Sequence, residues 1–426
     1  MYKSILKNKS FLGYWGSTTL MRLASNMLQF ALAIFVLDLT GSALIFSTVL
    51  SAIIFPRIIG TPIAGYLADY KDCLRILKLG ALGLTALMLS FFLIHTLITP
   101  LNISLIYVLV ICLELCETLI SASEMKAVIC IVDENQIAAA SKLSSLDDGI
   151  VEILSPVIAG FAYGLFGIQA VLLATLVSEL VAFLLTLMLR DRAKNMTENP
   201  GVMNKQSLFH EAMTSYKEAI VSLQEYNYVL GVILFAPLFN FFVSPLFSVT
   251  VPHFIRITTK SSIEIYTAYN LALGIASVVA PFIAMWLIRD KAEHKANLRG
   301  TIIYAFLMLI LSFVTQSFSN IQPATLLSII AGAMVLAVII ITLMSIATTI
   351  TVKTSIPEQV LGRIASIIQL CAIVSTPLGQ LLYGYFADRV PIFLLFVCSS
   401  LGLLATYVIM KKTYKKIKRE KQKNGY

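Results

Sequence analysis

Carboxylates at helical spacing inside long apolar stretches are the residues of this sequence best suited to chemistry. In the stretch 103–131, Glu114 and Glu117 are three residues apart, and Ser121 and Glu124 continue the same helical face. An ionised carboxylate near the centre of a bilayer costs about 2.5 kcal/mol or more, so such groups face a cavity, relay protons or hold cations. We therefore expect this face to have a function beyond packing.

A second acidic group lies in the next two apolar stretches. Asp148 and Glu152 are four residues apart with Asp147 beside them, and Glu179 lies midway along 168–189. A carboxyl group held among apolar helices favours its neutral form, and a group that gains and releases a proton can couple transport to a proton gradient. A position in headgroup water at the helix ends is the alternative that stays open for Asp147, Asp148 and Glu124.

The first apolar stretch carries a polar face that could partner these acids. Arg22, Asn26 and Gln29 follow one another at positions i, i+4 and i+7. We expect Arg22 to meet a carboxylate, whereas Arg57 could either do so or extend its charge toward the headgroups. Together, the following residues are predicted to couple protons or bind substrate: Arg22, Asn26, Glu114, Glu117, Asp147, Asp148, Glu152 and Glu179.

The second half of the chain contrasts with the first. Its polar points within apolar stretches are Asn240, Gln316 and Gln369, and phenylalanines cluster between Phe235 and Phe242. An acidic first half facing an aromatic second half suits an amphiphilic and cationic small molecule. An aromatic helix that faces lipid explains the phenylalanines equally well.

The composition identifies the elements that must position these residues. Of the 426 residues, 58% are hydrophobic and 13% charged, and the mean hydropathy is +0.86. Long apolar runs without strand-like alternation predict an all-α membrane protein of about twelve spans at roughly 20 residues each. The predicted spans are 11–37, 43–67, 75–97, 103–131, 138–165, 168–189, 227–250, 264–288, 299–317, 322–352, 362–386 and 391–410.

The charged loops predict the domains and the orientation. A long charged break divides the chain into an N-terminal six-helix bundle (1–190), a cytoplasmic linker (191–226), a C-terminal six-helix bundle (227–411) and a basic cytoplasmic tail (412–426). Most lysines and arginines fall on alternate loops, which places both termini in the cytoplasm and the protein in the cell membrane. The same placement explains the net charge of +9 without a nucleic-acid partner. We also expect no cleavable signal peptide, because no small-residue cleavage pattern follows the first span.

A weak internal repeat supports two pseudo-symmetric bundles. At one constant offset, Lys142, Ser145, Ser155 and Pro156 fall on Arg363, Ser366, Thr376 and Pro377. Duplicated bundles with a site at the membrane midplane are typical of secondary transporters.

Other chemistry finds little support in the sequence. The six cysteines have no metal-ligand partners nearby, the four histidines are scattered, and no Gly-x-x-x-x-Gly-Lys-Ser/Thr motif occurs. We therefore expect no metal, no cofactor and no enzymatic reaction, with small molecules, protons and lipid as partners of a monomer. A transport-inactive sensor or a membrane-embedded enzyme remains the alternative of another class.

Several motifs resemble those of a known transporter family. Gly65-Tyr-Leu-Ala-Asp69, with Arg75 further along, resembles the cytoplasmic loop motif Gly-x-Leu-Ala-Asp-Arg-x-Gly-Arg-Arg/Lys of the major facilitator superfamily, although Tyr70 and Cys73 replace its basic residues and Asp72 replaces its glycine. The resemblance implies that Gly65, Asp69 and Arg75 form part of a gating motif.

A second motif is similar to the Gly-Pro-x-x-x-Gly antiporter motif of the same superfamily. It comprises Ser155, Pro156 and Gly160, with serine in place of the first glycine. The stretches 38–43 and 356–366 further resemble the branch that contains macrolide efflux permeases and the enterobactin exporter. The resemblance implies the major facilitator fold and a proton-coupled exporter of amphiphilic drugs such as macrolides. Export of a siderophore or another metabolite is the alternative within the same class.

Overall fold

The structure is a computed structural model in which helices make up almost all of the described chain. The described residues are 5, 8–58, 60, 61, 64, 72–132, 134–189, 227–287, 293–317, 322–355 and 358–423. Within these ranges there is no β-strand. The predicted linker 191–226 lies outside them.

The chain forms two compact units. Unit 1 comprises residues 1–41, 52–201 and 262–271, and unit 2 comprises 42–51, 202–261 and 272–426. A short helical segment from each half of the sequence therefore groups with the helices of the other half. The domain boundaries given above stay a prediction.

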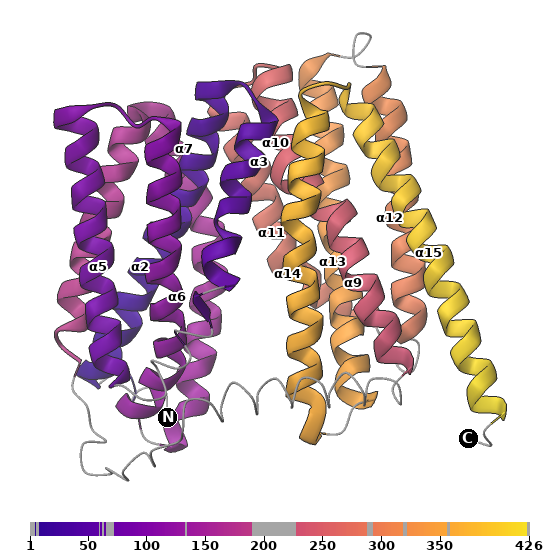
Figure 1. Cartoon of the computed structure of the whole chain (residues 1–426), viewed down its shortest axis with the longest axis horizontal. Helices are drawn as coiled ribbons and strands as arrows, with labels where there is room; N and C mark the ends of the chain where they lie inside the picture. Colours follow the sequence, from indigo (N-terminus) through magenta and orange to yellow (C-terminus); the bar gives the residue numbers. More distant parts are fainter. Residues whose placement is uncertain are drawn as a thin grey trace. The chain divides into compact units, whose positions relative to one another are not determined.

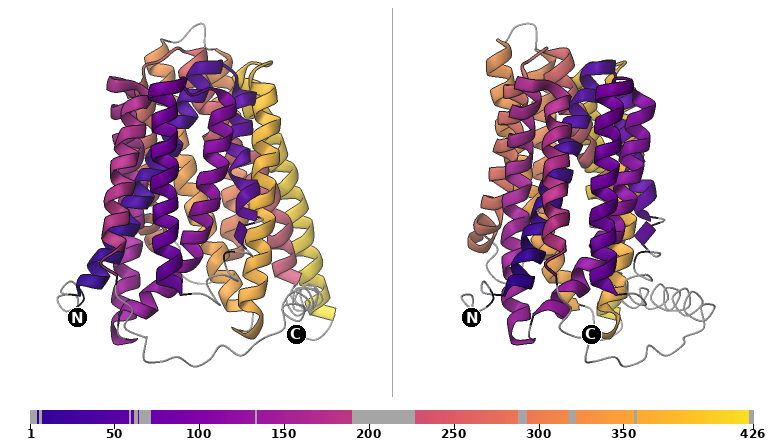
Figure 2. Two further views of the ribbon diagram at one scale, coloured as in Figure 1. Left: turned by 60° about the vertical axis from the view of Figure 1, so that its left-hand side comes forward. Right: turned by 90° about the vertical axis from the view of Figure 1, so that its left-hand side faces the viewer.

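Unit 1 is built on four long helices. These are α2 (Lys9–Thr40), α5 (Cys73–Leu93), α6 (Ile103–Ile131) and α7 (Glu134–Thr186). Helix α5 continues into a π-helical turn at Ile94–Ile98. Helix α2 packs along α7, while α5 packs against both α6 and α7 (Figure 1). The two violet helices α5 and α6 run side by side in both views of Figure 2.

Polar side chains fix where these helices begin. The Asn8 side chain accepts hydrogen bonds from the backbone N–H groups of Ser10 and Phe11 at the start of α2. At the start of α5, the Asp72 side chain accepts from those of Leu74 and Arg75. Gly41 ends α2 with φ +64°, a conformation that glycine adopts at little cost. These caps fix both ends of α2, which carries the polar face, and the start of α5.

Helix α7 contains two of the predicted spans. Gly167 interrupts it with φ 73° and ψ −173°, a backbone conformation that only glycine adopts readily. A single residue thus separates the two helical arms of α7, which explains the very short connection predicted between 165 and 168.

Unit 2 contains the remaining helices. They are α3 (Ala43–Ala52), α9 (Asn227–Pro245), α10 (Val251–His253) between the π-helical turns Leu246–Thr250 and Phe254–Thr258, most of α11 (Ile263–Leu287), α12 (Glu293–Gln316), α13 (Pro323–Ser355), α14 (Glu358–Ala387) and α15 (Ile392–Lys423). Helix α12 packs on α13 and α15, and α9 packs on α14 and α15. Residues 262–271, at the start of α11, group with unit 1.

The helices confirm an all-α membrane protein. In the part of the chain that the structure describes, nine helices are long and apolar enough to cross a membrane. One of them, Ile150–Thr186, includes the break at Gly167, and the apolar helix Ala43–Ile58 is shorter. Each of the twelve predicted spans overlaps a described helix.

Candidate functional site

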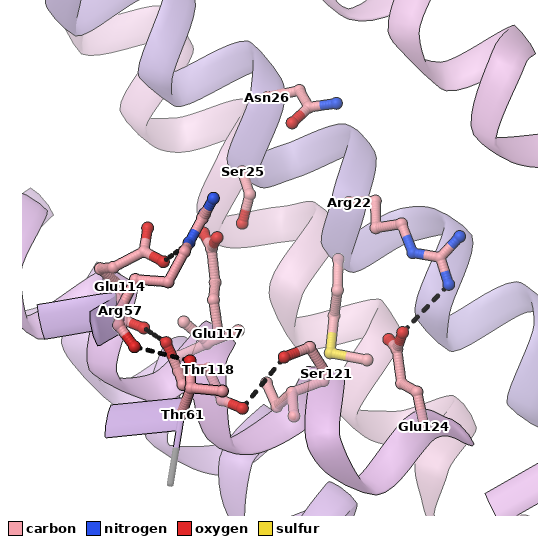
Figure 3. Close-up of a pocket in the computed structure, with 13 residues that line it drawn as sticks. Arg22, Ser25, Asn26, Arg57, Thr61, Glu114, Glu117, Thr118, Ser121 and Glu124 are labelled. Carbon is pink, nitrogen blue, oxygen red and sulfur yellow. Dashed lines mark hydrogen bonds and ion pairs between the residues drawn. The ribbon is translucent and has the colours of Figure 1, made fainter. Parts of the chain in front are cut away.

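A polar cavity of about 420 Å³ opens within unit 1, mainly between α2 and α6 (Figure 3). Its charged lining residues are Arg22, Arg57, Glu114, Glu117 and Glu124. Its other polar lining residues are Ser25, Asn26, Thr61, Thr118 and Ser121. Its apolar lining residues are Met21, Leu84 and Ile120. The volume falls within the range of about 300–1,000 Å³ that is usual for small-molecule sites.

The first ion pair of the cavity joins Arg57 to Glu114. The Nε of Arg57 donates to Oε1 of Glu114 at 2.6 Å. The Glu114 side chain is 2% exposed, whereas half of the Arg57 side chain is exposed. Arg57 therefore compensates a buried carboxylate and still presents part of its guanidinium to the cavity. The structure resolves the alternatives left open for Arg57 in favour of a pair.

The second ion pair joins the polar face of α2 to α6. An Nη of Arg22 lies 3.0 Å from Oε2 of Glu124, so Glu124 is the carboxylate that Arg22 was expected to meet. Both side chains are partly exposed. Asn26, one turn further along α2, is exposed and also lines the cavity.

Glu117 is the carboxylate between these pairs. It lies one turn from Glu114 on α6, and Figure 3 shows its carboxyl group reaching toward the Arg57 guanidinium and Ser25. Its Oε1 is shielded from solvent and has no hydrogen-bond partner in the described part of the protein. Ser25 and Gln29 of α2 lie beside the same carboxyl group. Glu117 is thus positioned to accept a proton or a cation that enters the cavity.

Glu179 lies deeper in unit 1 and does not line the cavity. Its side chain is 1% exposed, and its Oε2 lacks a hydrogen-bond partner among the described residues. The Thr85 hydroxyl of α5 donates to the backbone oxygen of Glu179 at 3.1 Å. The carboxyl groups of Glu117 and Glu179 are close enough to interact electrostatically.

The other acids of α7 have different surroundings. Asp147 is 6% exposed, and the Thr19 hydroxyl donates to its Oδ2 at 2.6 Å. Glu152 is exposed and does not line the cavity. The side chain of Asp148 lies outside the described residues. The structure thus gathers Arg22, Asn26, Glu114 and Glu117 in one cavity and places Asp147, Glu152 and Glu179 outside it.

The two motifs are described to different extents. Gly65 and Asp69 of the predicted gating motif lie outside the described residues, and Arg75 is exposed near the start of α5. In the antiporter-like motif, the buried Ser155 hydroxyl donates to the backbone oxygen of Val151 at 2.6 Å, and Pro156 lies inside α7. These roles stay predictions.

Gly160 closes the antiporter-like motif at a tight helix contact. It lies directly against the Thr267 side chain, so that a Cβ atom at this position would overlap Thr267. Small residues of this kind allow helix backbones to approach closely in membranes.

The polar residues noted in the apolar stretches of the second half have different surroundings, and Gln316 is exposed at the end of α12. The Asn240 amide donates to the backbone of its own helix at Ala236. The rings of Phe235 and Phe239 lie 5.3 Å apart in a tilted arrangement, and Phe239 meets Tyr304 edge-on within unit 2. The side chain of Gln369 lies outside the described residues. This aromatic cluster packs inside unit 2 and gives no evidence of ligand contact.

Three polar cavity residues, Ser25, Thr61 and Thr118, were not named from the sequence. Ser25 lies on the face of α2 that carries Arg22, Asn26 and Gln29, so helical spacing could have found it. Thr61 lies one turn after Arg57, and its hydroxyl bonds to the Arg57 backbone oxygen at 2.6 Å. No local signal distinguishes Thr61 from an ordinary helix threonine.

The cavity is lined mainly by charged and hydroxyl-bearing side chains. Among the described residues, no group of three or more histidine, cysteine, aspartate or glutamate side chains is placed to hold a metal ion. The mixed charges and hydroxyl groups instead suit hydrogen-bonded, charged small molecules.

Comparisons with known proteins agree with this fold. The family model of the Major Facilitator Superfamily matches residues 14–379. No curated protein sequence matches the chain.

Solved structures of transporters share the fold at low sequence identity. A bacterial homologue of the iron transporter ferroportin in an inward-facing state is 14% identical, with a TM-score of 0.67 over 96% of this chain and 98% of that chain. A D-xylose-proton symporter is 10% identical, with a TM-score of 0.68 over 94% and 96%. The peptide transporter POT in complex with sulfate is 13% identical, with a TM-score of 0.66 over 97% and 95%. The chain therefore belongs to the major facilitator superfamily: it is a multi-pass membrane transporter of small molecules, not an enzyme.

Proposed function

We propose that this transporter is a proton-coupled exporter in which Glu117 is the exchange site. The observation that carries the proposal is the unpaired Oε1 of Glu117 between two ion pairs of one cavity. Arg57 with Glu114 and Arg22 with Glu124 balance each other's charge, so Glu117 is the carboxylate left to neutralise. A proton or a cationic group of the cargo can do this, but not both at once.

Such competition produces exchange transport. Binding of a cation at Glu117 displaces the proton, and a proton arriving down its gradient displaces the cation. Glu179 lies close enough to interact with Glu117 and supplies a second carboxyl group for a proton relay. Export as the direction rests on the motif of Ser155, Pro156 and Gly160 and on the resemblance to the macrolide efflux and enterobactin exporter branch.

The resemblance to the macrolide efflux branch favours amphiphilic drugs such as macrolides as the cargo. The polar lining of the cavity favours the second candidate, a smaller metabolite, because ten of the thirteen lining residues are charged or polar. The proposal also places a monomer in the cell membrane with both termini in the cytoplasm, as the loop charges predict.

The decisive test is efflux from cells that express the protein in a strain lacking other exporters. We would load ethidium, a fluorescent amphiphilic cation, or radiolabelled erythromycin, and record efflux with and without a protonophore. Proton coupling predicts that the protonophore abolishes efflux. Efflux that continues unchanged after the gradient is collapsed would rule out the coupling.

The variants assign the coupling residue. Glu117→Gln keeps the shape of the side chain but cannot release a proton, so we expect it to abolish proton-driven efflux. Glu264→Gln is the matched control, because Glu264 is an exposed carboxylate at the start of α11 away from the cavity. Equal efflux by the two variants would contradict the role of Glu117.

A further inference from the structure

The guanidinium of Arg57 offers the cavity hydrogen-bond donors that no described side chain uses. Its Nε donates to Glu114, and within the described residues this is its one ion-pair contact. Half of the Arg57 side chain is exposed, and neither Nη group donates a hydrogen bond to a described residue. A guanidinium presents such groups as a planar fork that matches a carboxylate in a bidentate manner.

Glu117 offers the complementary acceptor a short distance away. Its unpartnered Oε1 and the nearby Ser25 hydroxyl can accept hydrogen bonds from an ammonium group. Figure 3 shows the Glu117 carboxyl group and the Arg57 guanidinium next to each other at the same end of the cavity. A guanidinium fork and a carboxyl group with one unbonded oxygen therefore lie at the same end of the cavity.

The rest of the lining sets the size and polarity of a ligand. The cavity measures about 420 Å³, and its apolar contacts are confined to Met21, Leu84 and Ile120. Ser121 and Thr118 add hydroxyl groups near the acidic residues. This lining suits a compact polar molecule with a short apolar part, and it would leave a large apolar ring system without matching contacts.

We infer that this cavity binds a small zwitterion whose ammonium and carboxylate groups are close together, as in an α-amino acid. The carboxylate lies on the two Nη groups of Arg57, and the ammonium group lies on the Glu117 carboxylate and on Ser25. The inference rests on the proposed function for the identity of the transport site and goes beyond it by naming the class of cargo. A ligand with one of the two charges leaves either the fork or the buried oxygen unsatisfied, which costs affinity.

A ligand panel on the purified full-length protein tests this directly. Each common α-amino acid with an uncharged side chain would be added as the free zwitterion, as the methyl ester, which is only a cation, and as the N-acetyl derivative, which is only an anion. We expect at least one free amino acid to raise the melting temperature and both its derivatives to lose the effect. Binding of the esters as tightly as the zwitterions, or no shift with any amino acid, would overturn the inference.

Variants separate the two ends of the ligand. Arg57→Lys keeps the charge but removes the fork, and we expect at least about a tenfold loss of affinity for the zwitterion. Arg299→Lys, at an exposed position of α12, is the matched control and should bind normally. Glu117→Gln should weaken binding of the zwitterion toward the level of the N-acetyl derivative, which lacks the ammonium group. Unchanged affinity of Glu117→Gln for the zwitterion would contradict the assignment of the ammonium group to Glu117.

The inference and the proposed function can fail separately. If the protein binds a zwitterion but its transport does not depend on the proton gradient, proton coupling is wrong and the cargo class is supported. If it exports ethidium in a proton-dependent manner but binds no zwitterion, proton coupling is supported and the cargo class is wrong.

Discussion

The carboxylate of Asp388 lies 2.6 Å from the hydroxyl of Ser42, a residue 346 positions earlier in the chain. The same carboxylate accepts hydrogen bonds from the backbone of Ala43 at 2.6 Å and of Leu44 at 3.1 Å, and Nε2 of His253 lies 3.6 Å away. Asp388 thus supplies the acceptor that the first turn of α3 lacks, and its negative charge stabilises the positive end of the helix dipole.

Replacing Asp388 with asparagine should loosen the start of α3. Asp388→Asn removes the charge and one acceptor oxygen, so we expect the free energy of unfolding to fall by about 1–2 kcal/mol. Thermal melting of the detergent-solubilised protein measures this. The neighbouring Arg389→Lys change, at an exposed side chain that stacks on Tyr385, serves as the control. Equal melting temperatures for both variants would show that the cap contributes nothing.

The pair of Arg57 and Glu114 should behave as a coupled unit. Arg57→Gln leaves the buried Glu114 carboxylate without its partner, so we expect a loss of roughly 1–3 kcal/mol in the free energy of unfolding. Adding Glu114→Gln removes the stranded charge and should recover part of that loss. A double-mutant cycle on the melting data gives the coupling energy, and effects that add to within about 0.5 kcal/mol would argue against the pair.

Much of the fold follows from the apolar runs alone. The predicted span 103–131 coincides with the bounds of α6, because Asn102 caps one end and a charged stretch follows the other. The two spans predicted on either side of residue 167 became a single interrupted helix. Short-range patterns locate Gly167 as a break, but the length of the connection depends on its individual backbone angles.

The candidate site was predictable as a set of residues but not as an arrangement. Spacing placed Glu114 and Glu117 on one face of a helix, and this face does line the cavity. Spacing could not show that Arg57 would compensate Glu114, or that Oε1 of Glu117 would have no hydrogen-bond partner among the described residues, because that depends on how two helices are rotated against each other. The same limit applied to Glu152, which the sequence placed among the deep acids and the structure leaves exposed.

Cysteines at the ends of α5 and α6 offer a test of helix packing in unit 1. The Sγ atoms of Cys73 and Cys130 lie 3.3 Å apart, although the residues are 57 positions apart in the chain. We expect mild oxidation with copper phenanthroline to join the two thiols, each losing a proton and an electron to the oxidant, and to yield a linked peptide pair in mass spectrometry. Cys398, in the span Ile392–Lys412 of unit 2, should stay unlinked and serves as the internal control. Absence of a Cys73–Cys130 link after oxidation would contradict this packing.

The close contact at Gly160 predicts that alanine lowers the free energy of unfolding at this position, whereas it should raise it at a glycine with free space around it. A Cβ atom at Gly160 would overlap the Oγ1, Cγ2 and Cβ atoms of Thr267, so Gly160→Ala should lower the free energy of unfolding by roughly 1–3 kcal/mol. Gly332→Ala is the matched control, because nothing lies within 4 Å of its added Cβ atom and alanine favours the helix by about 0.5–1 kcal/mol.

Thr267 provides the rescue for that contact. Its side chain is buried, and its hydroxyl has no hydrogen-bond partner among the described residues, so Thr267→Ala alone should cost little. In the Gly160→Ala background it removes two of the three overlapping atoms and should restore part of the lost melting temperature. A Gly160→Ala variant that melts like Gly332→Ala, or one that Thr267→Ala does not improve, would place the tight approach elsewhere and leave the glycine of the antiporter-like motif without a packing role.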